Sequence, residues 1–295
     1  MTKPEIQRST KNILPETVFG NLLDFDRIRR QSIIVYGRPH SGKTLLCSYE
    51  AARLAKIHGG GILIYSSEAN YASTAVVNTI KSIFDGFGVR YEIREVESVD
   101  SMTYELTKMR KEAVEEKASA EGNWTPEWRI IIVDSLNSMR ILIENTMTYF
   151  QRKSLGGMRS VISQLERVTW TVSRYAEAVD GWGILINSGT ATIGKLYRGI
   201  APYKPSYGEK AVHHTVGEVW LANPEDFPEN VKNKVLKSGK DLMNVRMAVV
   251  VSSREGGVGK GIVFEFEKTK SDSGVEYVKP TPLFAVEYKP EEEMI

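Results

Sequence analysis

Short apolar runs rich in β-branched residues alternate along this chain with longer amphipathic segments. Gln31–Tyr36 (QSIIVY), Gly61–Tyr65 (GILIY) and Arg129–Val133 (RIIIV) are almost entirely apolar, which is typical of strands buried on both faces. Segments such as Thr44–Lys56, which lies between the first two runs, carry apolar residues at helical spacing. This alternation predicts an α/β fold in which helices flank a twisted, mostly parallel sheet.

The same pattern supplies the remaining elements of the predicted domain. Further helices are expected at 76–84, 101–120 and 155–179, and further strands at 90–96, 182–187, 216–222, 245–252 and 261–267. We expect the C-terminal strands to be antiparallel. Residues 13–288 then form one domain, with a charged insertion or hairpin at 223–244. Residues 1–12 are expected to be a flexible polar arm, and residues 289–295 an acidic tail.

Composition narrows the class of protein. A chain of 295 residues that is 41% hydrophobic can bury the core of one large domain. Its 39 basic and 37 acidic residues nearly cancel, so a basic surface would have to be local. Cys47 is the single cysteine, which excludes an internal disulfide and fits a reducing compartment. With no apolar leader and no membrane-spanning run, we expect a cytoplasmic protein without a membrane partner.

The segment after the first strand matches the phosphate-loop pattern G-x-x-x-x-G-K-[ST]. Its residues are Gly37, Arg38, Pro39, His40, Ser41, Gly42, Lys43 and Thr44, and Leu45 follows. Glycines at both ends let the backbone curl so that its N–H groups point at a phosphate, and the following helix adds its positive N-terminus. Lys43 is expected to bridge the β- and γ-phosphates of ATP, and the Thr44 hydroxyl to bind Mg²⁺.

Two carboxylates follow strands that should end at the same edge of the sheet. Asp134 comes directly after RIIIV and is the expected partner of Mg²⁺; as an additional role it would be the N-cap of the next helix. Glu68 follows GILIY after two serines and is the candidate group that orients the attacking water. The alternative for Glu68 is a solvated loop residue, the commonest environment of glutamate.

The order of these landmarks carries a family resemblance. GRPHSGKT, ILIYSSE with Glu68, IIIVDS with Asp134 and ILINS with Asn187 and Ser188 follow one another in the chain. This order resembles the ATPase core of the RecA superfamily, with archaeal RadA and its paralogues closest and the KaiC-like ATPases as near relatives. The resemblance implies nucleotide at the carboxyl edge of the sheet and a water-activating role for Glu68.

The family also implies two loops that hold single-stranded DNA. The first falls within Thr146–Gly157 and includes Arg152 and Lys153, and the second falls within Gly189–Lys210. The second loop carries four basic residues, one acidic residue and three tyrosines, namely Lys195, Arg198, Lys204, Lys210, Glu209, Tyr197, Tyr203 and Tyr207. Cations that follow a phosphate backbone and aromatic faces that stack on bases suit binding of single strands. A plain surface loop or a protein contact has the same composition, so both stay open.

Some residues depart from the family pattern. Recombinases have Asn-Gln where this chain has Asn187-Ser188, and serine is too short to report the γ-phosphate to the DNA loops. A Phe-x-x-Ala oligomerisation motif and an N-terminal helix-hairpin-helix domain are not expected. Arg254 and Lys260 are candidates for cations that act on the nucleotide of a neighbouring copy, or are exposed charges.

Together these features predict a slow, Mg-dependent ATPase similar to RadA paralogues, which binds single-stranded DNA and assists recombinational repair. A recombinase or another repair protein, and further copies of the chain, remain open as partners. The alternative is a KaiC-like regulatory ATP switch that acts through a protein partner without DNA.

Overall fold

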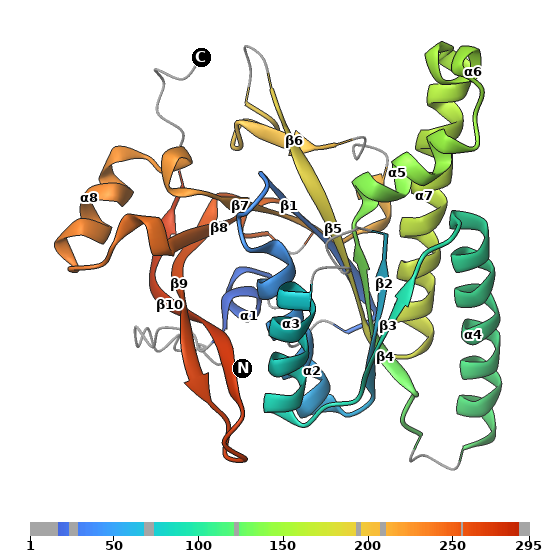
Figure 1. The fold of residues 1–295 in the computed structure, drawn as a ribbon, viewed down its shortest axis with the longest axis horizontal. Coiled ribbons are helices and arrows are strands. Elements are labelled where there is room, and N and C mark those ends of the chain that lie inside the picture. The colour runs from blue at the N-terminus through green and yellow to red at the C-terminus, as the bar shows by residue number, and fades with distance from the viewer. Residues whose placement is uncertain are drawn as a thin grey trace, which may run out of the picture.

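The computed structural model describes residues 17–23, 29–67, 74–120, 124–192, 196–206, 211–254 and 256–288. Its strands are β1 (Gln31–Gly37), β2 (Gly61–Ser66), β3 (Tyr91–Glu95), β4 (Trp128–Asp134), β5 (Trp182–Ala191), β6 (Tyr203–Pro205), β7 (Gly217–Ala222), β8 (Val245–Ser253), β9 (Lys260–Lys270) and β10 (Glu276–Glu287). In these parts of the chain they form one sheet in the order β10-β9-β8-β7-β1-β5-β4-β2-β3, and β6 pairs with β5 (Figure 1).

The sheet divides into a parallel and an antiparallel half. The strands from β3 through β2, β4, β5 and β1 to β7 are parallel neighbours. The strands from β7 through β8 and β9 to β10 pair in antiparallel fashion. This confirms the predicted α/β class with a mostly parallel core and antiparallel C-terminal strands. The sequence pattern does not predict β10, because Pro280 and Pro282 and the exposed polar positions of this edge strand weaken the strand signal.

Helices cover both faces of the sheet. They are α1 (Val18–Leu23), α2 (Lys43–His58), α3 (Thr74–Phe87), α4 (Val99–Ser119), α5 (Leu136–Asn145), α6 (Tyr149–Lys153), α7 (Leu155–Ala178) and α8 (Glu229–Lys237). The side chains of β1 alternate between the layers: Ile33 and Val35 pack with α1, α2 and α3, whereas Ile34 and Tyr36 share a core with α4, α5, α7 and α8. Among the described helices, none has the length and hydropathy that crossing a bilayer requires.

The charged segment between β7 and β8 is helical. It contains α8 between two short 3-10 turns, Pro224–Asp226 and Leu242–Asn244. Val231 and Val235 on α8 are buried against the sheet, which gives this excursion a face that packs on the core. It is therefore a small helical insertion and not a hairpin.

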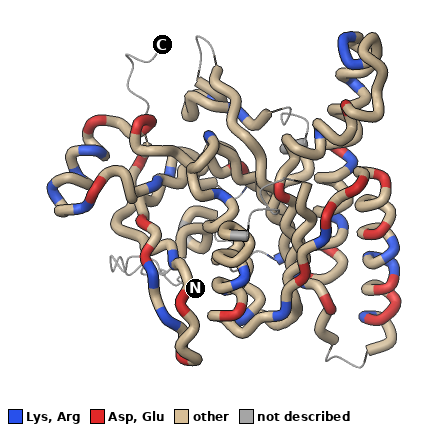
Figure 2. Tube along the Cα trace, in the orientation of Figure 1, with Lys and Arg blue, Asp and Glu red and all other residues tan. Residues whose placement is uncertain are grey.

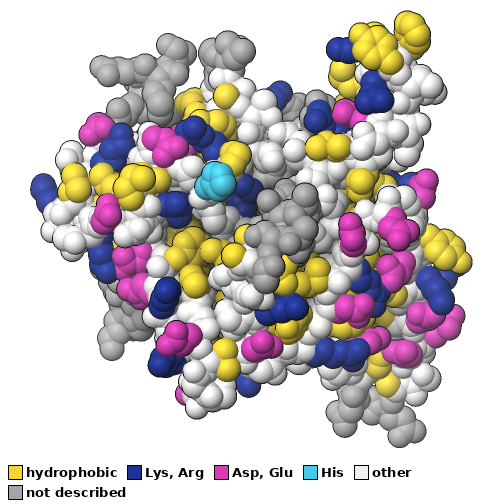
Figure 3. All heavy atoms as spheres, in the orientation of Figure 1, with side chains coloured by type: hydrophobic (Ala, Val, Ile, Leu, Met, Phe, Trp, Pro, Cys, Tyr) yellow, Lys and Arg dark blue, Asp and Glu magenta, His cyan; other side chains and the backbone are white. Residues whose placement is uncertain are grey.

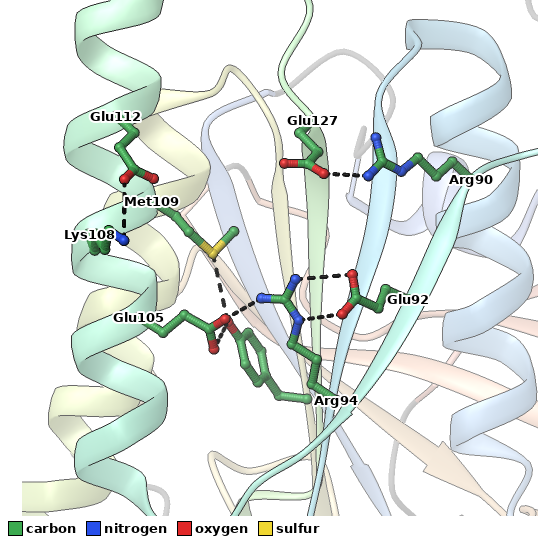
Figure 4. A network of polar contacts seen from close by, with 9 residues as sticks. Arg90, Glu92, Arg94, Glu105, Lys108, Met109, Glu112 and Glu127 are labelled. Atoms are coloured by element: carbon green, nitrogen blue, oxygen red, sulfur yellow. Dashed lines mark hydrogen bonds and ion pairs between the residues drawn. The ribbon is translucent and has the colours of Figure 1, made fainter.

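Polar contacts fix α4 at the β3 edge of the sheet (Figure 4). Nε and Nη2 of Arg94 donate to the two oxygens of the Glu92 carboxylate, at 2.7 and 3.0 Å. Arg94 also pairs with Glu105 on α4, which in turn accepts a hydrogen bond of 2.9 Å from the Tyr65 hydroxyl of β2. The bond to Arg94 holds the pKa of Glu92 below its usual range. The network thereby joins β2 and β3 to α4 through charge-assisted hydrogen bonds.

Candidate functional site

The phosphate loop lies where β1 ends and α2 begins. Gly42 is the N-cap of α2 in the left-handed region at φ 84°, and a Cβ there would lie 2.5 Å from the ring of Phe266 on β9. A Cβ on Gly37 would lie 2.3 Å from the carbonyl oxygen of Leu221 on β7. Both ends of the loop therefore need glycine, one for its backbone angle and both for space.

Lys43 and Thr44 are the first two residues of α2, directly after Gly42. The Lys43 ammonium donates to the carbonyl oxygens of Gly37 at 3.1 Å and Arg38 at 2.8 Å, so it lies across its own loop. The Thr44 hydroxyl donates to Oδ2 of Asp134 at 2.7 Å. Two residues 90 positions apart are thus brought together at the carboxyl edge of the sheet.

Asp134 is fixed at the end of β4. The residue is 1% exposed, and its carbonyl oxygen accepts a hydrogen bond of 2.9 Å from the backbone N–H of Ser67. The N-cap of α5 is Ser135, whose hydroxyl accepts from the backbone N–H of Ser138. The additional N-cap role considered for Asp134 is therefore wrong, and its side chain faces Thr44. Glu68, the predicted catalytic residue, lies outside the described residues.

Cys47 lies beneath the loop on α2 and is fully buried. Burial raises the pKa of its thiol well above the usual range, and the neighbouring Asp134 carboxylate acts in the same direction. The thiol therefore stays protonated at neutral pH. It acts as a small apolar core residue.

Asn187 and Ser188, which stand where the family senses the γ-phosphate, adjoin the first glycine of the loop. Gly37 pairs with Ser188 in the register of β1 and β5. The buried Asn187 donates from Nδ2 to the carbonyl oxygen of Ser206 at 2.9 Å, and its Oδ1 accepts from the backbone N–H of Ser188 at 2.8 Å. The Asn187 side chain therefore links β5 to the segment that follows β6.

Arg38 connects the loop to the helical excursion. Its guanidinium donates to Glu225 at 2.8 Å and lies 5.9 Å from the ring centroid of Tyr203. Arg246 on β8 donates to the carbonyl oxygen of His40, which has φ 61° and is exposed. Sequence reasoning missed these neighbours of the loop, because residues 165 to 206 positions later in the chain carry no signal of their proximity.

The first predicted DNA loop is helical and projects from the body (Figure 1). Arg152 and Lys153 lie on α6, beside Tyr149 at 67% and Phe150 at 83% exposure. No acidic residue occurs between positions 146 and 160, and basic residues mark this end in Figure 2. The space-filling view shows hydrophobic and basic side chains together at the projecting tip (Figure 3). Exposed aromatic rings and cations are thus gathered on the projecting helix α6.

The second predicted DNA loop folds back on the sheet. Tyr197 and Arg198 both contact Glu218 of β7, at 2.9 and 2.8 Å. Lys204 belongs to β6, which pairs with the end of β5. Lys195 lies outside the described residues. DNA contact by these residues stays a prediction.

Arg254 and Lys260 lie away from the phosphate loop of their own chain. The backbone N–H of Arg254 donates to the carbonyl oxygen of Val216, whose own N–H donates to Ser32 near the start of β1. Gly37 is five residues further along β1, roughly 17 Å at the rise of a strand. Lys260 begins β9, three strands from β1. A role for either in nucleotide chemistry requires a second copy.

Comparison with known proteins yields a match in structure only. No protein-family model matches the chain, and no curated protein matches its sequence. The fold is similar to a solved structure titled "Crystal structure of the RadB recombinase", with 16% identity and a TM-score of 0.47. The similarity covers 81% of this chain and 88% of that one.

Proposed function

We propose that this chain binds ATP with Mg²⁺ at the loop 37–44 and hydrolyses it slowly, as a RadA-paralogue-like protein that binds single-stranded DNA in recombinational repair. The observation that carries the nucleotide site is the contact of 2.7 Å between Thr44 and the buried Asp134 beside Lys43. A hydroxyl and a carboxylate at that spacing are the oxygen donors that a phosphate-bound Mg²⁺ uses.

Each residue of the site has a distinct task in this proposal. The Lys43 ammonium now donates to two loop carbonyls, and phosphate oxygens would give it stronger, charged acceptors. Thr44 and Asp134 would hold Mg²⁺, which supplies neutralisation of charge on the β- and γ-phosphates. Glu68 is the proposed group that orients the attacking water.

DNA binding rests on two segments with cations and aromatic rings. Helix α6 exposes Arg152 and Lys153 beside the rings of Tyr149 and Phe150. The segment 196–206 carries Arg198 and Lys204 together with Tyr197 and Tyr203. Stacking on aromatic faces and cations along the backbone favour single strands of any sequence.

Titration calorimetry with ATP, with and without Mg²⁺, tests the nucleotide site. Lys43→Ala should lose detectable binding, whereas Glu68→Gln should bind ATP and turn it over at least about a hundredfold more slowly. Lys56→Ala, which removes an exposed lysine from the far end of the same helix, is the matched control and should bind as the wild type does. Equal binding by Lys43→Ala and the wild type would contradict the assignment.

The DNA-binding half has its own test. Affinity for labelled oligo(dT) should fall steeply as salt rises, because bound cations release counterions. Arg152→Ala and Lys153→Ala should each reduce the slope of log affinity against log salt by about one. If no oligonucleotide binds at low ionic strength with ATP present, the KaiC-like switch becomes the better proposal, and the exposed rings of Tyr149 and Phe150 become candidate contacts for a protein partner.

A further inference from the structure

A carboxylate lies buried beneath the second segment proposed to bind DNA. Glu218 on β7 is 0% exposed. The Tyr197 hydroxyl donates to its Oε2 at 2.9 Å, and Nε of Arg198 lies 2.8 Å from its Oε1. An aromatic and a basic residue that suit a nucleic acid are therefore already engaged by an internal anion.

The contact holds the segment against the core. Tyr197 and Ala201 form an isolated bridge in which the backbone N–H of Tyr197 donates to the carbonyl oxygen of Ala201 at 2.7 Å. Ala201 is fully buried, and the Tyr197 ring meets Tyr36 edge to face at 6.4 Å. The Arg198 guanidinium lies 5.3 Å from the Tyr197 ring centroid, so both side chains point to the same carboxylate.

Several features oppose this closed arrangement. Burial disfavours the charged form of Glu218 and raises its pKa, although Arg198, Tyr197 and Ser252 act in the opposite direction. Oε1 lacks a hydrogen bond of ordinary geometry within the described chain. Arg198 has φ 52°, in the left-handed region that strains a non-glycine residue, and Gly199 follows at φ 71°. The side chain of Arg198 is still 40% exposed, so a competing anion can reach it.

We propose that Glu218 is an internal substitute for a DNA phosphate. It engages Arg198 and Tyr197 in the protein without nucleic acid, and both side chains must leave it before they contact single-stranded DNA. This inference rests on the proposed DNA-binding function. It implies that the wild type binds DNA more weakly than it would with Arg198 and Tyr197 free of Glu218. The affinity is reduced in proportion to the fraction of molecules in which the contact with Glu218 is open.

The test is the affinity of full-length protein with ATP for labelled oligo(dT). Glu218→Gln keeps the shape of the side chain and removes the charge, so it should bind about five- to tenfold more tightly. Glu177→Gln removes one negative charge from an exposed ion pair near the C-terminal end of α7 and is the matched control. Its affinity should change less than about twofold.

A double-mutant cycle identifies Arg198 as the released group. Arg198→Ala should weaken binding in the wild type and should abolish the gain in Glu218→Gln. Tyr197→Phe keeps the ring on Tyr36 but cannot donate to Glu218, and should give a smaller gain. If Glu218→Gln fails to fold, as judged by circular dichroism, Tyr197→Phe carries the test.

Trypsin supplies a readout that needs no nucleic acid. Cleavage after Arg198 should be faster in Glu218→Gln than in the wild type and the control. If Glu218→Gln folds and binds DNA no more tightly than the wild type does, this inference alone is overturned, and Glu218 is a structural support. Absence of oligonucleotide binding by the wild type and by Glu218→Gln overturns the proposed DNA function together with it.

Discussion

At the scale of single residues, the phosphate loop shows how closely its backbone is packed. Gly42 combines a left-handed φ of 84° with a Cβ position 2.5 Å from Phe266. Gly88, after α3, has φ 64° but open space around the same position. The two glycines therefore separate the cost of a backbone angle from the cost of a collision.

We predict that Gly42→Ala destabilises the protein more than Gly88→Ala. A left-handed alanine costs about 1–2 kcal/mol at either site, and the collision with Phe266 adds about 1–3 kcal/mol at Gly42 alone. Urea unfolding of both variants measures the difference, and Gly42→Ala/Phe266→Ala should show non-additive costs, because the second change removes the collision. Equal costs for the two glycine variants would show that the ring moves aside freely.

The candidate site was predictable where a local motif encodes it. The loop 37–44 and Asp134 follow apolar strands directly, so their place at one edge of the sheet follows from parallel topology. The contact of Arg38 with Glu225 is different, because 187 residues separate them and surface charges carry no pairing information. The contact between Arg198 and Glu218 could not be predicted for the same reason, since a lone glutamate in an apolar strand does not indicate its partner.

At the scale of elements, periodicity predicts the parallel strands and fails at α6. The segment 146–157 was expected to be a loop because the family resemblance places a DNA-binding loop there, whereas the structure has the short helix α6 in it. Thr148 and Gln151 nevertheless form a capping box, in which each side chain accepts from the backbone N–H of the other. This T-x-x-Q spacing was the available signal for a helix whose side chains are all exposed.

The ion pair of Arg94 with Glu92, both on β3, yields a prediction on pH. Arg94→Met keeps the aliphatic stem and loses the charge, so it should destabilise the protein by about 1 kcal/mol at neutral pH, a modest value because the pair is partly exposed. Since the pKa of Glu92 is lowered in the folded state, its contribution is complete above the unfolded value of about 4.3. That contribution is lost as pH falls through the lower folded value.

The stability gap between wild type and Arg94→Met should therefore narrow as pH falls below about 4. Urea unfolding at a series of pH values measures the gap. Arg174→Met, which breaks the exposed pair with Glu177, should cost less than about 0.5 kcal/mol. A gap for Arg94→Met that stays constant down to acid pH would assign the cost to packing and not to the ion pair.

At the scale of the whole molecule, the sheet separates the phosphate loop from the cations proposed to assist it. Arg254 lies level with the start of β1, and its guanidinium donates to the carbonyl oxygen of His213 at 2.6 Å. The phosphate loop follows the other end of β1. If Arg254 contributes to turnover, it does so on the nucleotide of another copy, which makes the rate depend on assembly.

The expected outcome is a specific ATPase rate that rises with protein concentration in the wild type and stays low and flat in Arg254→Ala. Stabilising charge on the transferred phosphoryl group is worth a factor of about 10³ or more when an arginine is supplied in trans, so even a partly formed assembly should give a measurable rise. Light scattering on the same samples shows whether Arg254→Ala still associates, which separates a lost cation from a lost interface. Lys268→Ala removes an exposed cation from β9 and should follow the wild-type curve. Because a cation acting within one chain would give a rate independent of concentration, a flat wild-type curve would exclude the trans role.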